Sequence, residues 1–358
     1  MSAIFGILGI DDTDRVFVAT IGQRVVYDAI TNLLERYNAD LKAALGVFVE
    51  GETEDYKVRF KLPGGGRLQR LGRQAPPAEV RAVGQWDVAY PLEGFGAAVG
   101  GGRVDMAYMT VQDLDKHLDT VTIQDINTVR QEMLKALFNN NQDSFVDRLW
   151  GTLLIEPLAN GDSVNYPPVL GSESEATEDH YLSAGFAASA ISDTNNPYLT
   201  IVNELEEHFG AVTGGANIVT FIHPDEVPET QALTNFADVE TLGIRLGDDT
   251  ARAVGLPGNL PGRIIGRMSD GTWVVEWRWM PAAYMLGIHL EVARPLAIRV
   301  DPADTGLERG LALVARDEEY PLETSYWEHR FGMGASNRLN GVFMFVDAGA
   351  FAIPAGFT

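Results

Sequence analysis

A basic stretch from Tyr56 to Arg103 interrupts an otherwise acidic chain. The 358 residues include 27 Lys and Arg against 50 Asp and Glu, a formal charge of −23. Between Tyr56 and Arg103 eight basic residues stand against three acidic ones, so this stretch carries +5 and the remainder −28. Opposite charges on two parts of one polypeptide favour contacts between copies of it. The pattern therefore favours a fold that projects a basic limb from an acidic body.

The same stretch has the pattern of a two-armed β-hairpin. Apolar residues alternate with Lys57, Arg59 and Lys61 in the first arm, and alternation returns from Trp86 to Leu92. Residues 63–66 break the first arm, and we interpret the glycine-rich residues 94–102 as a flexible hinge. Because a two-stranded ribbon is marginal alone, we expect its apolar face to pack on a neighbouring copy. The residues predicted to make this inter-subunit contact are Lys57, Arg59, Lys61, Arg67, Arg70, Arg73, Arg81 and Trp86.

Helical periodicity predicts three longer helices. The first covers residues 23–45, and a third covers residues 197–209 and ends at Gly210. The second covers residues 123–138, is capped by Thr122, and has a buried stripe of Ile126, Val129, Met133 and Leu137. Predicted strands, which dominate the second half, include residues 152–155, 218–222, 272–279, 283–290, 296–300, 342–346 and 351–353. The predicted fold class is α+β.

Composition excludes several classes of protein and site. The chain has no cysteine, so disulfides, thiolate metal sites and a cysteine nucleophile are excluded. No run approaches 18 apolar residues, and residues 1–10 lack the basic region of a signal peptide. The acidic balance argues against broad nucleic-acid binding. A 46% hydrophobic content is enough for a substantial core, which we expect in two domains.

No motif specific to an enzyme is present. Residues 94–100 resemble a dinucleotide-binding turn, but the third glycine is misplaced and no helix pattern follows. His223 to Glu226 has the pattern of a strand end turning into a helix, with a metal site or proton relay as the alternative. Trp273, Trp277 and Trp279 have the alternation of a sheet core, with a stacking platform for a base or sugar as the alternative. We therefore expect no catalytic residue, cofactor or metal.

Three segments and the order of the elements resemble a known family. The segments are residues 60–69, residues 124–130, and residues 327–332 with 337–341. They are similar to segments of the major capsid protein of tailed bacteriophages, whose fold is named after the Hong Kong phage and is shared with encapsulins. The resemblance covers essentially the whole chain.

The resemblance implies a domain organisation. Residues 1–45 would be an N-terminal arm with a helix, and residues 46–105 an extended hairpin loop that lies across an adjacent subunit. Residues 106–196 would form the peripheral domain with a spine helix at 123–138. Residues 197–320 would form the axial domain, and residues 321–358 would return to the peripheral domain. Because the arm begins almost at Met1, we expect a separate scaffold or none.

The resemblance also implies a function without catalysis. The chain would self-assemble, as hexamers and pentamers, into an icosahedral shell around a double-stranded DNA genome held without sequence-specific binding. It would lie in the virion, and in the host cytoplasm during assembly. Portal, scaffolding and decoration proteins would be its further partners, and no membrane would be involved.

Two alternatives stay open at this point. An encapsulin-like compartment would use the same fold to hold cargo enzymes in place of a genome. A hydrolase or sugar-binding protein of the α+β class would use carboxylates and the tryptophan cluster. Particle size distinguishes the last alternative from the others, since it predicts a small stable monomer.

Overall fold

The computed structural model describes residues 23–61, 85–100, 108–167, 176–213, 217–239, 260–269, 271–315 and 324–357. The chain forms two compact units, each assembled from separated stretches. The first unit contains Met1–Ala43, Leu92–Glu132 and Val300–Gly332. The second contains Ala44–Pro91, Met133–Arg299 and Met333–Thr358. The domain boundaries expected from the sequence stay predictions.

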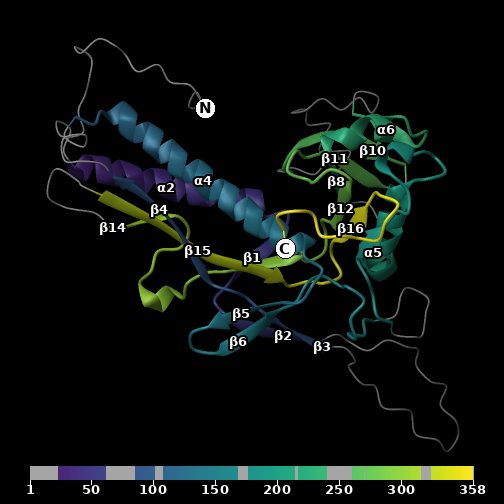
Figure 1. The fold of residues 1–358 in the computed structure, drawn as a ribbon, viewed down its shortest axis with the longest axis horizontal. Coiled ribbons are helices and arrows are strands. Elements are labelled where there is room, and N and C mark those ends of the chain that lie inside the picture. Colours follow the sequence, from purple (N-terminus) through teal and green to yellow (C-terminus); the bar gives the residue numbers. More distant parts are fainter. Residues whose placement is uncertain are drawn as a thin grey trace, which may run out of the picture. The chain divides into compact units, whose positions relative to one another are not determined.

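Two long helices and three antiparallel strands build the first unit. Helix α2 covers Gln23–Leu45, as predicted, and helix α4 covers Val111–Phe138, with its last turns in the second unit. The first unit contributes β4 (Glu93–Gly100), β14 (Ala312–Ala315) and β15 (Thr324–Ala335) to a five-stranded sheet that also includes β1 (Val49–Thr53) and β13 (Leu296–Arg299). A short helix η4 (Ala303–Thr305) precedes β14. Figure 1 shows α2 and α4 running alongside one another. The core between helices and sheet consists of Ile30, Leu34, Leu118, Val121, Leu311 and Trp327.

Helix α4 is twelve residues longer at its start than the sequence predicted. Thr110, and not Thr122, caps it: the Thr110 hydroxyl accepts from the Asp113 N–H, and the Asp113 carboxylate accepts from the Thr110 N–H. Thr122 lies inside the helix, where its hydroxyl donates to the carbonyls of Leu118 and Asp119. The prediction that Thr122 caps the helix was wrong. A threonine inside a helix can donate its hydroxyl to a carbonyl of the preceding turn, so it need not mark the start of the helix.

The glycine-rich segment expected to be a hinge is strand β4. It pairs antiparallel with β15 from Glu93 opposite Phe331 to Gly100 opposite Thr324. Ala97 and Val99 alternate toward the core of the first unit. Gly94 and Gly96 lie close to β15: a Cβ on Gly96 would lie 3.0 Å from the Trp327 carbonyl oxygen, and one on Gly94 would lie 3.0 Å from a Glu328 carboxylate oxygen. The alternation of side chains along residues 93–100 was therefore a better indicator of their structure than their glycine content.

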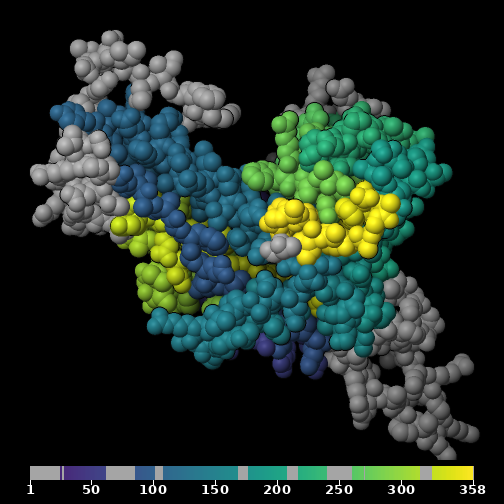
Figure 2. Space-filling view, in the orientation of Figure 1, coloured from purple at the N-terminus to yellow at the C-terminus, as the bar shows by residue number. Residues whose placement is uncertain are grey.

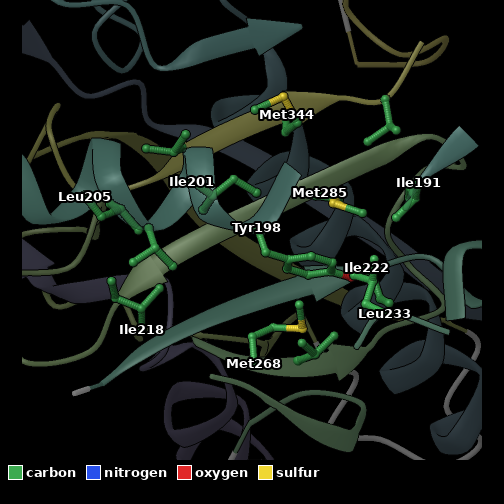
Figure 3. Close-up of a cluster of buried hydrophobic side chains, with 14 of the residues drawn as sticks. Ile191, Tyr198, Ile201, Leu205, Ile218, Ile222, Leu233, Met268, Met285 and Met344 are labelled. Carbon is green, nitrogen blue, oxygen red and sulfur yellow. The ribbon is translucent and has the colours of Figure 1, made fainter. Parts of the chain in front are cut away.

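A seven-stranded mixed sheet is the centre of the second unit. Its spatial order is β7-β16-β12-β8-β11-β10-β9. In chain order the strands are β7 (Tyr181–Ser183), β8 (Ile218–Ile222), β9 (Phe236–Asp238), β10 (Arg263–Met268), β11 (Thr272–Glu276), β12 (Tyr284–His289) and β16 (Val342–Phe345). Helix α5 (Pro197–Thr213) lies against it and packs Tyr198, Ile201 and Leu205 onto Met285 and Met344 (Figure 3).

Several predicted elements of this unit are confirmed and others are corrected. Strand β8 has the predicted bounds, and His223 caps the short helix η3 (Pro224–Glu226), which leads into α6 (Val227–Gln231). Helix α5 continues past Gly210, and residues 351–353 are not a strand. Trp273 and Trp277 are buried, but β11 ends at Glu276 and Trp279 lies beyond it with 40% of its surface exposed.

Three strand pairs complete the second unit. Strand β1 (Val49–Thr53) pairs in parallel with β13 (Leu296–Arg299). Strands β2 (Lys57–Lys61) and β3 (Gln85–Ala89) form the base of the predicted basic hairpin. Strands β5 (Asp143–Asp147) and β6 (Gly151–Ile155) form a second hairpin, and η2 (Ala188–Ala190) is a single turn. In the part of the chain that the structure describes, no helix is both long and apolar enough to cross a membrane.

Glu226 is a buried carboxyl group in this unit. Only 1% of the residue is exposed, and its Oε1 accepts from the Ala283 N–H at 2.6 Å, in the connection before β12. Ala283 has a φ of 66°, in the left-handed region that residues with a Cβ rarely adopt. The Oε2 atom of Glu226 has no hydrogen-bond partner. Burial, reinforced by the charge of Asp225, raises the pKa of Glu226 to about 7.

Replacing Glu226 with Gln should stabilise the protein at pH 8 and have little effect near pH 4.5. The folded-state pKa lies above the ordinary value of 4.5, so ionisation destabilises the folded chain progressively from about pH 4.5 to pH 7. Gln keeps an acceptor for Ala283 and carries no charge, so we expect a gain of about 3 kcal/mol at pH 8. Urea unfolding at both pH values measures it. Glu308→Gln, at an exposed position, is the control, and an equal gain at both pH values would contradict the assignment.

Candidate assembly surface

The base of the basic hairpin brings its predicted cations onto one face. Strand β2 pairs with β3 so that Arg59 lies opposite Asp87 and Lys61 opposite Gln85. The Asp87 carboxylate accepts from Arg59 at 2.6 Å and lies 2.8 Å from the Lys57 ammonium group. Hydrogen bonds from Arg59 and Lys57 hold the pKa of Asp87 well below its usual range. Two of the predicted cations are therefore partly neutralised within the hairpin.

The apolar face of this base packs inside its own chain. The Trp86 ring stacks on Phe60 with centroids 5.4 Å apart and lies 5.9 Å from the Tyr166 ring. Val88, Tyr90 and Leu339 belong to the same buried cluster. We expected the apolar face of the hairpin to be buried on a neighbouring copy. In β2 and β3 it is instead covered by residues of the same unit, which bury Trp86. Lys57, Arg59 and Lys61 remain on the exposed side.

The remaining predicted contact residues of the basic hairpin belong to its tip. Arg67, Arg70, Arg73 and Arg81 lie outside the described residues, as does Arg103. Their contact with a neighbouring copy stays a prediction from the sequence.

The predicted stripe of the spine helix faces inward. Val129, Met133 and Leu137 are buried, and Ile126 is half-buried. Spacings of three and four residues place these side chains on one side of α4, which explains their shared burial.

A surface that the sequence analysis missed lies on the β5–β6 hairpin. Val146, Leu149, Trp150 and Leu154 are exposed large apolar side chains on this one element. Leu154 was assigned to a strand, but residues 143–147 were not recognised as its partner. Phe145 and Asp147 are half-buried and Val146 between them is exposed, so residues 145–147 alternate in the way that is typical of a strand.

One buried side-chain network resembles the dyads of hydrolases. Asp125 on α4 accepts from the Tyr37 hydroxyl at 2.7 Å, and its other oxygen lies 2.7 Å from Nδ1 of His329 on β15. Asp125 and His329 are both buried, which keeps substrate and water from the pair. Burial and the hydrogen bond to Asp125 raise the pKa of Tyr37 above its ordinary value. The network connects α2, α4 and β15 and has a structural role.

Three carboxylates in the second unit form an acidic cluster. Oxygens of Glu178, Glu204 and Glu207 lie within 4.8 Å of one another, a spacing that could hold a hard cation. Burial and the charge of Glu207 raise the pKa of Glu204 to about 7. The raised pKa means that a proton can occupy the cluster instead, and no other feature of these residues points to a metal.

No model of a known protein family matches the chain, and no curated protein matches it either. The chain is similar to a solved structure of Mycobacterium phage Patience, with 16% sequence identity and a TM-score of 0.68. That similarity covers 100% of this chain and 98% of the phage chain. The chain has the fold of a phage protein. The predicted α+β class is confirmed, and the phage resemblance is confirmed at the level of the fold, while the expected arm, extended loop and domain bounds stay predictions.

Weaker similarities include two capsid structures. The capsid of a native GTA particle aligns at 15% identity and a TM-score of 0.47, over 85% of this chain and 90% of that chain. The capsid of Ralstonia phage GP4 aligns at 13% identity and a TM-score of 0.44, over 83% and 84%.

The sequence segments that carried the phage resemblance hold this fold together. Trp327 and Phe331 on β15 are buried, and between them His329 contacts Asp125. In the turn before β16, the Asn340 side chain accepts from the His289 N–H and donates to the His289 and Ala293 carbonyls. Residues 327–332 therefore contribute to the packing of the first unit, and residues 337–341 to the packing of the second.

Proposed function

We propose that this chain is the major structural protein of a phage capsid and self-assembles into an icosahedral shell around a double-stranded DNA genome. The observation that carries the proposal is the shared fold, which extends over the whole of this chain and nearly the whole of the phage chain. The sequence resemblance to capsid proteins supports it independently. The chain would act without catalysis, in the virion, after assembly in the host cytoplasm.

Charge distribution supports repeated contacts between copies. A body of strongly negative charge keeps subunits soluble and apart, and a basic hairpin offers complementary contacts at defined places. Closed symmetry multiplies contacts that are individually modest. Scaffolding, portal and decoration proteins are the further partners that we propose, and DNA would be held without base-specific contacts.

Particle analysis tests this function. We expect purified protein to form megadalton particles in light scattering and closed shells in negative-stain microscopy. Nuclease-protected DNA in particles from infected cells supports a genome container, whereas enzyme cargo without DNA would indicate an encapsulin-like compartment. A stable monomer at all concentrations, with or without co-expressed scaffold, would overturn the proposal.

Reversing the charge of the hairpin tip should prevent assembly and leave folding intact. We expect Arg67→Glu, Arg70→Glu and Arg73→Glu together to give a soluble, folded subunit that forms no shells, because copies would then repel one another at this contact. The matched control replaces the same three residues with Lys and keeps the charge. Circular dichroism reports folding and microscopy reports shells. Normal particles from the Glu variant would refute the role of the basic limb.

A further inference from the structure

The outer face of the β5–β6 hairpin is an unusually apolar surface for this chain. Val146 is 80% exposed, Leu149 83%, Trp150 53% and Leu154 46%. Strand register places Val146 beside Thr152, and Leu154 beside Ser144, on the side away from buried Leu153. Figure 1 shows the hairpin extending next to β2 and β3. We call Val146, Leu149, Trp150 and Leu154 the apolar hairpin face.

The hairpin is held rigidly in its exposed position. The Asp147 carboxylate accepts from the backbone N–H groups of Leu149 and Trp150, at 2.8 and 3.0 Å, which fixes the turn. Asp147 also lies 3.6 Å from the Arg299 guanidinium group on β13. The Trp150 ring stacks on Tyr56 with centroids 4.3 Å apart and planes inclined by 10°. A turn and a ring that are already held in this way lose little entropy on binding, which suits a contact.

The Trp150 stack joins this face to the basic hairpin. Tyr56 immediately precedes Lys57, the first residue of β2, so Trp150 rests on the root of the arm that carries Lys57, Arg59 and Lys61. Strand β6 also lies beside β3. The apolar hairpin face therefore adjoins the described basic arm within the second unit, and Figure 2 shows these segments of the chain next to one another.

We propose that the apolar hairpin face is a contact surface for a second copy of this chain. The proposal rests on the proposed function and adds a residue-level contact to it. Each copy carries −23, so copies repel over most of their surface. The four side chains of the apolar hairpin face carry no charge, and the nearby Asp147 carboxylate lies 3.6 Å from the Arg299 guanidinium group, so this face opposes the approach of another copy less. Arg148, in the turn, is the one charged side chain between β5 and β6. The neighbouring basic arm supplies attraction to the acidic remainder of another copy.

The size of the face favours a repeated shell contact over an isolated dimer. Even complete burial of four side chains removes less surface than the roughly 800 Å² per partner of a standard interface. Such a contact gains significance when symmetry repeats it in every subunit. A free monomer, in contrast, would gain nothing from presenting four large apolar side chains to water.

The test replaces Val146 and Leu149 with Ser in the full chain and measures assembly. We expect the double variant to fold with an unchanged unfolding midpoint, because both side chains are exposed. Its critical concentration for shell formation, from light scattering, should rise at least about tenfold, which corresponds to about 1.4 kcal/mol per subunit. Leu307→Ser, at an exposed apolar position of the first unit, is the matched control and should assemble like the parent chain.

Trp150 provides a second readout that does not depend on those variants. Acrylamide should quench its fluorescence less in shells than in subunits, measured as the difference between the parent chain and Trp150→Phe. If the parent chain forms shells while the double variant assembles equally well or Trp150 stays equally accessible, the inference is overturned and the proposed function stands. If the parent chain forms no shells, the proposed function itself fails.

Discussion

Replacing Arg338 with Met should lower the free energy of unfolding by about 3 kcal/mol. Arg338 is completely buried, with 0% of its surface exposed. Its Nε donates to the Pro157 carbonyl at 2.7 Å, and its Nη2 donates to the Leu158 carbonyl at 3.1 Å and lies 2.8 Å from the Asp162 carboxylate. Met fills the volume of the stem but leaves two carbonyls and a carboxylate without their donor.

A matched change at the surface separates the buried contacts from charge alone. Arg263 pairs with Glu276 at 2.6 Å, but 68% of the Arg263 side chain is exposed. Arg263→Met should therefore cost less than about 1 kcal/mol. Urea midpoints of both variants give the comparison. Equal losses would mean that the Arg338 contacts contribute no more than an exposed ion pair.

Adding one methyl group at Gly287 should be about as damaging as losing Arg338. Gly287 lies in β12, where α5 approaches so closely that a Cβ would overlap Cγ2 of Ile201. Ile201 is fully buried and cannot move outward. We expect Gly287→Ala to cost about 3 kcal/mol, the upper part of the range for overpacked cores, measured by urea unfolding.

Two further variants make this prediction specific. Gly51→Ala in β1 should be neutral, because nothing lies within 4 Å of the new Cβ. Ile201→Leu removes the methyl group on the Cβ of residue 201, so combining it with Gly287→Ala should cost less than the sum of the single changes. A strictly additive double variant would show that the overlap with Ile201 is not the cause.

Local pattern was sufficient for the elements that the sequence predicted well. Helix α2 has the predicted bounds because Ile30 and Leu34 repeat at a helical spacing on a long, unbroken segment. Strand β8 was predicted because four apolar residues and one β-branched threonine, bounded by polar residues, suit a strand buried on both faces. In both cases the spacing of the element's own apolar residues was enough to identify it.

The elements that were missed or misread depend on partners outside the segment's own hydrophobic period, some of them distant in the sequence and some nearby. Strand β4 forms although it is rich in glycine, because β15, more than 220 residues later, supplies its hydrogen bonds. Helix α4 begins at Val111 because a threonine and an aspartate satisfy each other across its first turn. The β5 strand depends in the same way on its pairing with β6.

The candidate assembly surface was predicted in part. Alternation located the basic arm and its cations, since charge and period are both local properties. Two features depended on packing: the burial of Trp86 against Phe60 and Tyr166 inside its own chain, and the exposure of Trp150 on the neighbouring hairpin. Sequence alone does not distinguish the two tryptophans, because burial depends on what covers each one.

The basic hairpin, the α+β class and the phage resemblance followed from the sequence alone, because charge, period and element order are properties of the chain read in one dimension. Tertiary structure decided which faces are covered and which stay free. It buried most of residues 327–332 and 337–341 and left the apolar hairpin face exposed. The physical reason is that burial is a property of pairs of distant segments, and no single segment contains the partner that covers it.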